Sequence, residues 1–195
     1  MKIKEILIAT KNKGKIKEFE NMFEGYDIKI KTLYDYDLPD IRETGNSFYE
    51  NALIKAKAGY EISSLPTISD DSGLEVEALG GKPGIYSARF GGEGLGDFER
   101  IEYLLGQLKG KNKRNARFIT SLVYFDGRMT KEFKGVWNGV ILEEPRGKNG
   151  FGYDPVFYDE TLKRTAAELT KEEKRKVSHR GKAFKEFFKF FKDFI

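Results

Sequence analysis

Two adjacent acidic residues, Asp70 and Asp71, follow an apolar strand pattern in the stretch "ISDDSGLEVEALGG" (68–81). Adjacent carboxylates repel each other and lose hydration energy wherever they are partly buried, so a cation is expected beside them. Mg²⁺ takes oxygen ligands and binds through one or two carboxylates together with substrate phosphates. The pair therefore predicts a metal or general-base site, and an Asx-turn that caps Ser72 and Gly73 is the structural alternative.

The stretch "TKNKGK" (10–15) places Thr10, Asn12 and Lys15 in a turn between a predicted strand and the N-terminus of a predicted helix. Backbone N–H groups and the helix dipole favour a phosphate at such a turn. Lys15 adds a mobile positive charge. The spacing is not GxxxxGK[ST], which excludes a Walker-type P-loop. An ordinary polar turn would use the same residue types, so both interpretations stay open.

The stretch "ETGNSFYENALIKA" (43–56) contains a predicted helix start at Ser47, with Glu50 as its capping-box partner. Asn51 and Lys55 are four residues apart, so they share one face of this helix and could address one ligand. The alternative for these two side chains is a solvated helix face.

The stretch "GFGYDPVF" (150–157) begins like a dinucleotide-binding GxGxxG motif, but Pro155 stands where the last glycine belongs. What remains is a rigid loop around Gly152 that presents Phe151 and Tyr153, which suit stacking on a base. Asp154 is fixed just before the proline. Aromatic residues are as often part of a core, so this alternative also stays open.

The stretch "TKEEKRKVSHRGKA" (170–183) places Lys174, His179 and Arg180 at the start of the last predicted helix. A lone histidine is usually structural. With Arg180 beside it, the pair offers donors for the carbonyl oxygens of a base or for phosphates.

These residues need a scaffold, and the hydrophobic pattern predicts one of mixed strands and helices. Strands are expected over 3–10, 26–33, 67–69 and 74–79, with a long hairpin over 116–142 that turns at Asp126-Gly127. Helices are expected over 14–25, 48–62, 97–109 and 181–195. Strands and helices do not alternate strictly, which favours an α/β fold with a mixed, elongated sheet.

The composition of the chain limits the classes of protein to which it can belong. The chain has 195 residues, 39% hydrophobic and 34% charged, which fits one folding unit. The net charge of +4 comes from interleaved lysines and acids, so a nucleic-acid arm is not indicated. The absence of cysteine excludes disulfides and thiolate chemistry. No segment approaches about 18 apolar residues, so we expect a soluble cytoplasmic protein without a membrane partner.

Taken in order, these motifs resemble the inosine triphosphate pyrophosphatase family, hydrolases of non-standard purine nucleoside triphosphates. The matching blocks are TxNxxK at 10–15, ETGxSFxENAxxKA at 43–56, SDDSGLxVxALGGxPGIYSARF at 69–90, GFGYDPVF at 150–157 and TAAELTxEEKxxxSHRGKA at 165–183. Lys11 and Lys13 add charge to the first block, and Arg42 stands beside Glu43. The segment 91–96 and the helix after it fit the family less well.

The resemblance implies a single domain over 1–195, two-lobed around an elongated mixed sheet with flanking helices, with the active site in the cleft between the lobes. It implies a homodimer, Mg²⁺ as cofactor, and hydrolysis of ITP, dITP and XTP to the monophosphate and pyrophosphate by attack of water on the α-phosphorus. The alternatives are a pyrophosphatase for modified pyrimidine nucleotides and a nucleic-acid-binding module.

The resemblance also assigns roles to residues. Asp71 is expected to be the general base and a metal ligand, Glu43 the second metal ligand, and Asp70 a supporting acid. Lys55 is expected at the phosphates as part of the catalytic set. The expected substrate-binding residues are Thr10, Asn12, Lys15, Ser72, Phe151, Gly152, Tyr153, Asp154, Lys174, His179 and Arg180. Donors from Arg180 at the 6-oxo edge would favour hypoxanthine over adenine.

Overall fold

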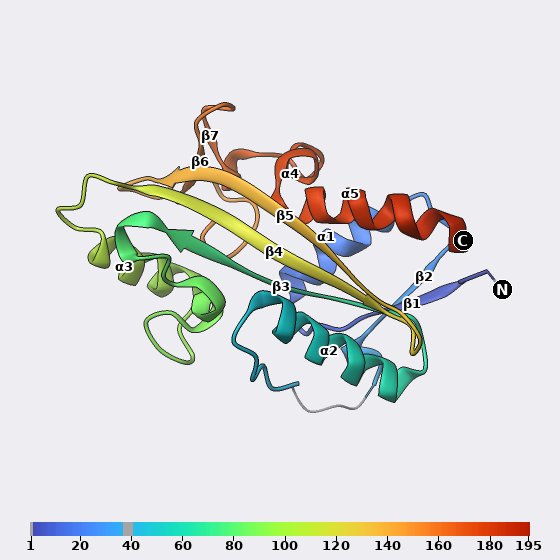
Figure 1. The fold of residues 1–195 in the computed structure, drawn as a ribbon. Coiled ribbons are helices and arrows are strands. Elements are labelled where there is room, and N and C mark those ends of the chain that lie inside the picture. The colour runs from blue at the N-terminus through green and yellow to red at the C-terminus, as the bar shows by residue number, and fades with distance from the viewer. Residues whose placement is uncertain (1, 37–40) are drawn as a thin grey trace. The chain divides into compact units, whose positions relative to one another are not determined.

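The computed structural model describes residues 2–36 and 41–195, and these ranges form a seven-stranded mixed sheet with helices beside it (Figure 1). The strands are β1 (Glu5–Ile8), β2 (Lys29–Thr32), β3 (Thr67–Val76), β4 (Asn115–Phe125), β5 (Thr130–Ile141), β6 (Phe157–Asp159) and β7 (Arg164–Thr165). The helices are α1 (Lys13–Phe23), α2 (Phe48–Ser63), α3 (Asp97–Gln107), α4 (Lys171–Val177) and α5 (His179–Phe191). Short 3₁₀ segments complete the elements, among them η3 (Gly84–Arg89) and η4 (Ala166–Glu168).

The sheet order is β2-β1-β3-β4-β5-β6-β7. Strand β1 pairs in parallel with β2 and β3, whereas β6 pairs antiparallel with β5 and β7. The expected α/β fold with a mixed sheet is confirmed. The parallel pairs need crossovers, and in the chain order α1 lies between β1 and β2 and α2 lies between β2 and β3.

The chain divides into two compact units. Unit 1 comprises Met1–Asp71, Thr120–Gly135 and Arg180–Ile195, and unit 2 comprises Ser72–Ile119 and Val136–His179. Strands β3, β4 and β5 contribute residues to both units. The division agrees with the two lobes expected from the sequence.

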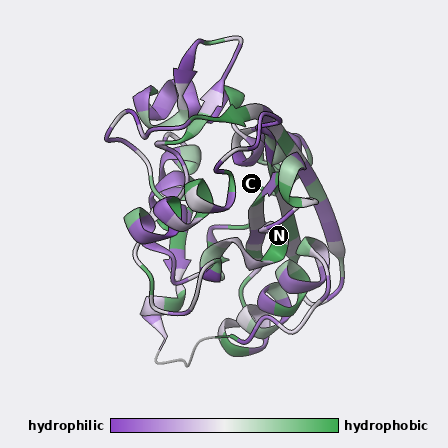
Figure 2. Cartoon of the chain, turned by 90° about the vertical axis from the view of Figure 1, so that its left-hand side faces the viewer, coloured by the Kyte–Doolittle hydropathy of each residue, from purple (hydrophilic) through white to green (hydrophobic). Residues whose placement is uncertain are grey.

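Unit 1 has helices on both faces of its strands (Figure 1). Alternate strand residues face opposite sides, so even-numbered residues such as Ile8 and Ile68 pack with α1 and α5, where Phe19 and Phe187 are fully buried. On the other face, Ala52 and Ala56 of α2 pack against Val123. The amphipathic patterns of α1 and α5 explain this layering, and Figure 2 shows hydrophobic and hydrophilic residues alternating along the helices.

Unit 2 has a core of its own. Leu104 of α3, Phe118 of β4, Trp137 of β5 and Phe157 of β6 belong to one cluster of buried side chains. The indole Nε1 of Trp137 donates to Asp159 Oδ2 over 2.7 Å, so the one buried polar atom of the ring is satisfied. No helix in the described ranges combines the length and the apolar character that a bilayer crossing requires.

Three expectations about local structure are wrong. The strand does not stop before the acidic pair, because β3 runs unbroken from Thr67 to Val76. Lys174 does not lie at the start of the last helix, because it belongs to a separate helix α4 that ends at Val177, and α5 begins at His179. Ser47 does cap α2, but the Glu50 carboxylate accepts from the N–H of Asn46 (2.6 Å). The capping box is therefore half formed.

Candidate functional site

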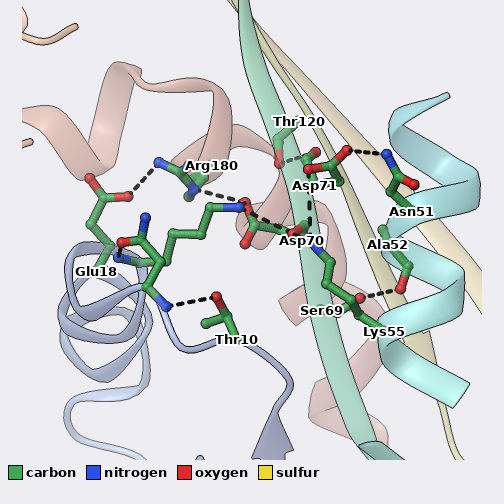
Figure 3. A network of polar contacts seen from close by, with 12 residues as sticks. Thr10, Glu18, Asn51, Ala52, Lys55, Ser69, Asp70, Asp71, Thr120 and Arg180 are labelled. Atoms are coloured by element: carbon green, nitrogen blue, oxygen red, sulfur yellow. Dashed lines mark hydrogen bonds and ion pairs between the residues drawn. The ribbon is translucent and has the colours of Figure 1, made fainter. Parts of the chain in front are cut away.

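The acidic pair lies in the middle of β3, so its two side chains point to opposite faces of the strand (Figure 3). Asp70 faces α1 and α5 and is fully buried. Asp71 faces α2 and is 5% exposed. Burying two carboxylates costs several kcal/mol each unless cations and hydrogen bonds compensate, roughly as for any ion moved out of water. Unit 1 supplies different cations to the two residues.

The cations beside Asp70 are Lys15 of α1 and Arg180 of α5, and Figure 3 shows Arg180 between Asp70 and Glu18. Lys15 Nζ lies 3.1 Å from Asp70 Oδ2, and Arg180 Nε lies 3.0 Å from the same atom. Arg180 Nη1 also donates to Glu18 Oε2 over 2.9 Å. The carboxylates of Asp70 and Glu18 thus both bind the Arg180 guanidinium, which the resemblance assigns to binding of the nucleobase.

Burial shifts the protonation equilibria of these cations. It lowers the pKa of the Lys15 ammonium, and the attraction of Asp70 only partly restores it. For Arg180 burial also lowers the pKa, but Asp70 and Glu18 together raise it above the ordinary value. Asp70 and Glu18 therefore favour the charged form of Arg180.

Around Asp71 the partners come from α2 and the segment before it. Asn51 Nδ2 donates to Asp71 Oδ2 over 3.2 Å. Lys55 Nζ lies 3.7 Å from Asp71 Oδ1 and 2.5 Å from Glu43 Oε1, and it donates to the carbonyl oxygen of Asp70 over 2.8 Å. Asn51 and Lys55 are buried, so the solvated-face alternative for them is wrong.

This arrangement raises the pKa of Asp71 above the ordinary value of an aspartate. The largest cause is burial, which the ammonium groups of Lys55 and Lys15 oppose, while the charge of Glu43 raises the pKa further. A carboxyl group with a raised pKa beside cations is a candidate general base.

Glu43 and Asp71 are the two carboxylates that could hold a metal ion. Both lie within ion-pair distance of the same ammonium nitrogen, so their oxygen atoms face a common point that favours positive charge. In the ranges 2–36 and 41–195 no group of three or more His, Cys, Asp or Glu side chains is placed to hold a metal. Two carboxylates fit Mg²⁺, which takes its remaining ligands from water and substrate phosphates.

The turn before α1 uses its polar side chains locally. Asn12 is the N-cap and its Oδ1 accepts from Lys15 N over 3.0 Å, while Thr10 Oγ1 accepts from Asn12 N over 3.1 Å. These bonds shape the helix N-terminus and direct Lys15 towards Asp70. Their proposed contacts with phosphate stay predictions.

In unit 2 the structure brings together Lys174 and the aromatic loop. Lys174 Nζ is 2.5 Å from Asp154 Oδ2 and lies 5.0 Å from the centroid of the Phe151 ring. Asp154 Oδ2 also accepts from Phe151 N over 2.9 Å. Gly150, at φ +78°, permits this, because a Cβ there would stand 2.0 Å from Asp154 Oδ2.

Two other predicted site residues of unit 2 are anchored in its interior. Tyr153 is 5% exposed, belongs to the core cluster and donates its hydroxyl to Ser87 O over 2.8 Å. The His179 ring is stacked on Phe118, with centroids 4.9 Å apart. Ser72 continues β3 directly after Asp71. Phe151, partly exposed, is the aromatic residue of the loop that suits a base.

Sequence reasoning overlooked two carboxylates that bind site residues. Glu18 pairs with Arg180 and lies three residues after Lys15, so the helical repeat places both on one face of α1. Asp97, the first residue of α3, accepts from the N–H of Gly152 over 2.7 Å. No local sequence pattern predicts the contact between Asp97 and Gly152, because the two residues are 55 positions apart in the chain.

The sequence as a whole matches the Ham1 family over residues 6–190. The chain belongs to the Ham1 family. A Ham1 relative from Geobacillus kaustophilus, named dITP/XTP pyrophosphatase, is 49% identical over 185 residues, which cover 93% of this chain and 91% of the relative. The expected family is thereby confirmed.

Solved Ham1 structures share the fold. The Staphylococcus aureus Ham1 protein is 42% identical with a TM-score of 0.86, covering 97% of this chain and 99% of that one. A HAM1 protein from Coxiella burnetii is 39% identical with a TM-score of 0.89, covering 98% and 100%. The chain thus has the Ham1 fold over nearly its full length.

Proposed function

We propose that this chain is a nucleoside-triphosphate pyrophosphatase that hydrolyses dITP, XTP and ITP to the monophosphate and pyrophosphate. The supporting observation is the cluster of Glu43, Lys55 and Asp71 in unit 1, where two carboxylates and an ammonium group share one point. The relatives named dITP/XTP pyrophosphatase support the substrate class.

The mechanism follows from the surroundings of Asp71. Its carboxylate takes a proton from a water molecule whose oxygen attacks the α-phosphorus, and the bond from that phosphorus to the α–β bridging oxygen breaks, releasing pyrophosphate. Asn51 holds the carboxylate through Oδ2, and Lys55 lies 3.7 Å from Oδ1. Lys55 and Lys15 would neutralise phosphate charge.

Mg²⁺ would be held by Glu43 and Asp71, and when bound it supplies positive charge at the phosphate oxygens. Asp70 has a different task. Its charge fixes Lys15 and Arg180 beside β3, and its carbonyl oxygen accepts from Lys55, so it orients the cations.

The base would be bound by the aromatic loop of unit 2. Phe151 offers a partly exposed ring that carries the Lys174 ammonium group 5.0 Å from its centroid. Phe151, Gly152, Lys174, His179 and Arg180 stay in the proposed substrate-binding set. Tyr153 and Asp154 act in it by fixing the loop.

We also propose that the chain acts as a homodimer in the cytoplasm. Tyr86, Phe98 and Tyr103 of unit 2 are 55%, 63% and 42% exposed, and a subunit interface would remove such rings from water. Analytical ultracentrifugation at two protein concentrations tests the dimer.

The experiment that tests the function is pyrophosphate release from a panel of dITP, XTP, ITP, ATP, GTP and modified pyrimidine triphosphates, with Mg²⁺ and with a chelator. We expect the three non-standard purines to be favoured and the chelator to abolish release. Preference for pyrimidines, or no release together with retention on single-stranded DNA, would favour the alternatives.

A second experiment tests the position of attack. When the reaction runs in water enriched in ¹⁸O, the label is expected in the monophosphate, and label in the pyrophosphate would refute attack at the α-phosphorus.

A further inference from the structure

The loop over 149–154 carries Phe151 and has no helix or strand of its own. Its ends are fixed within unit 2: Asn149 N donates to Ala167 O over 3.0 Å, and Asp154 accepts from Phe151. Gly152, in the middle, has φ +60°, and a Cβ there would contact nothing within 4 Å. Glycine restricts its own backbone least of all residues, so contacts with other residues must select this conformation.

Asp97 supplies that restraint. Its Oδ2 accepts from the N–H of Gly152 over 2.7 Å, a charge-assisted contact between α3 and the middle of the loop. The side chain of Asp97 is 52% exposed, so on its own it could turn away into water.

Arg100 prevents that movement. Its Nη1 donates to Asp97 Oδ1 over 2.9 Å, and its Nη2 donates to the carbonyl oxygen of Leu95. Only 14% of the Arg100 side chain is exposed, so burial holds the guanidinium and the guanidinium holds the carboxylate. The segment 91–96 and α3, which fit the family motifs less well, are thus connected to the aromatic loop through two side chains.

We propose that Asp97, held by Arg100, is a positioning residue that fixes the Gly152 peptide and so presents the Phe151 ring to the base of the nucleotide. The inference rests on the proposed function, because it takes the loop as the base site. A restrained loop binds its ligand more tightly, since less conformational freedom is lost on binding. The effect belongs to recognition of the base and leaves the attack on phosphorus untouched.

The test distinguishes an effect on binding of the nucleobase from an effect on binding of the phosphates. Binding of IMP, which carries the base, and of inorganic tripolyphosphate, which carries none, is measured by calorimetry without turnover. Asp97→Ala is compared with Glu102→Ala, an exposed acid on the same helix, and with Asp97→Asn, which keeps an acceptor for the Gly152 N–H. Amide hydrogen exchange at Gly152 reports the loop directly.

We expect Asp97→Ala to weaken IMP binding roughly tenfold, the scale of one lost charge-assisted hydrogen bond. Exchange at Gly152 should become faster, while tripolyphosphate binding and kcat stay within about twofold, inside the scatter of surface substitutions. Asp97→Asn should retain IMP affinity within about threefold, because a neutral acceptor restores part of the bond. Glu102→Ala should change none of these quantities.

Unchanged exchange at Gly152 in Asp97→Ala would overturn the proposal, as would equal weakening of IMP and tripolyphosphate, which indicates general damage. If Asp97→Ala does not fold, Arg100→Gln carries the same test, because it releases the carboxylate without removing it. A chain that hydrolyses none of the panel would remove the proposed function, and the calorimetric comparison would still decide the part played by Asp97.

Discussion

Asp70 and Asp71 are neighbours in sequence but differ in chemistry because successive strand residues face opposite sides. Asp70 Oδ2 forms ion pairs with both Lys15 and Arg180. Asp71 has Lys55 at the longer distance of 3.7 Å and Asn51 as a neutral partner. Burial raises the pKa of the Asp71 carboxyl, so Asp71 is the candidate base of the pair.

Asp71→Asn keeps the size of the side chain and an acceptor for Asn51, but it cannot accept a proton. We expect kcat for dITP to fall by about a hundredfold or more, the usual scale for a lost general base. Asp70→Asn is the matched variant, and its activity should fall mainly through weaker nucleotide binding. Near-normal turnover of Asp71→Asn would exclude it as the base.

The raised pKa of Asp71 predicts pH effects of opposite sign on activity and stability. Activity needs the ionised form, so the acid limb of the kcat/KM profile should lie above the pKa of an ordinary aspartate.

The same shift affects stability. A carboxyl group whose pKa is raised by folding stabilises the folded state at pH values below its unfolded-state pKa, and this stabilisation is lost as the pH rises through the folded-state pKa. Asp71→Asn should therefore have a higher Tm than wild type at pH 8, and the difference should vanish in acid. An equal or lower Tm at pH 8 would contradict the raised pKa.

A substitution of Arg180 tests whether this side chain contributes both to the preference for ITP over ATP and to the stability of the fold. Arg180→Ala leaves Asp70 and Glu18 without their shared cation, so the unfolding free energy should fall by about 3–5 kcal/mol, as when one partner of a buried pair is removed. The preference for ITP over ATP should fall at least about tenfold if its donors contact the 6-oxo group. Lys185→Ala, exposed on the same helix, is the control. A lower Tm with an unchanged ITP to ATP ratio would assign Arg180 to the charge network alone.

The residue types at the site could be predicted from the sequence, but their partners could not. The motifs singled out Lys15, Lys55 and Asp71, and the structure brings all three together in unit 1. Glu18 was missed because a glutamate on a lysine-rich helix is common, and only the fold shows that Arg180, 162 residues later, lies beside it.

At the scale of elements, the periodic patterns predicted most helices correctly, because amphipathic faces show in the sequence. Helix α1 buries Ile16, Phe19, Met22 and Phe23, which the helical repeat places on one face. The break of β3 was mispredicted because Asp, Ser and Gly are turn formers, and local propensity gave way to pairing in the middle of the sheet. The division between α4 and α5 was missed because no glycine or proline marks it.

Two glycines within helices make opposite predictions. A Cβ on Gly59 of α2 would stand 2.9 Å from Leu7 Cδ2 and 3.1 Å from Ala9 Cβ, so Gly59→Ala should destabilise the protein by about 1–3 kcal/mol through overpacking against β1. A Cβ on Gly106 of α3 would meet nothing within 4 Å, so Gly106→Ala should stabilise by about 0.5–1 kcal/mol. Urea unfolding measures both. If the two variants shifted the midpoint in the same direction, the close approach of α2 to β1 would be disproved.

At the scale of the whole molecule, the question is whether the two compact units unfold together. Each has its own buried cluster, which would permit separate transitions. Strands β3, β4 and β5, however, pass without interruption from one unit into the other. A strand cannot lose half of its pairing without exposing the backbone groups of the rest, which favours one cooperative transition.

Phe187 and Trp137 allow this to be measured. Phe187 is fully buried in unit 1, and Trp137, the only tryptophan of the chain, lies in the core of unit 2. Phe187→Ala should cost about 3–5 kcal/mol and lower Tm by roughly 10 °C, given about 2–4 °C per kcal/mol for a chain of this size. If the chain is one cooperative domain, Trp137 fluorescence will follow the same lowered transition as far-UV circular dichroism.

Ile62→Ala is the control. Ile62 is 40% exposed on α2, so this substitution should shift the midpoint of neither signal by more than a degree or two. A fluorescence transition that keeps the wild-type midpoint while circular dichroism shifts would mean that a core defect in unit 1 leaves unit 2 folded, and the chain would then hold two independent domains.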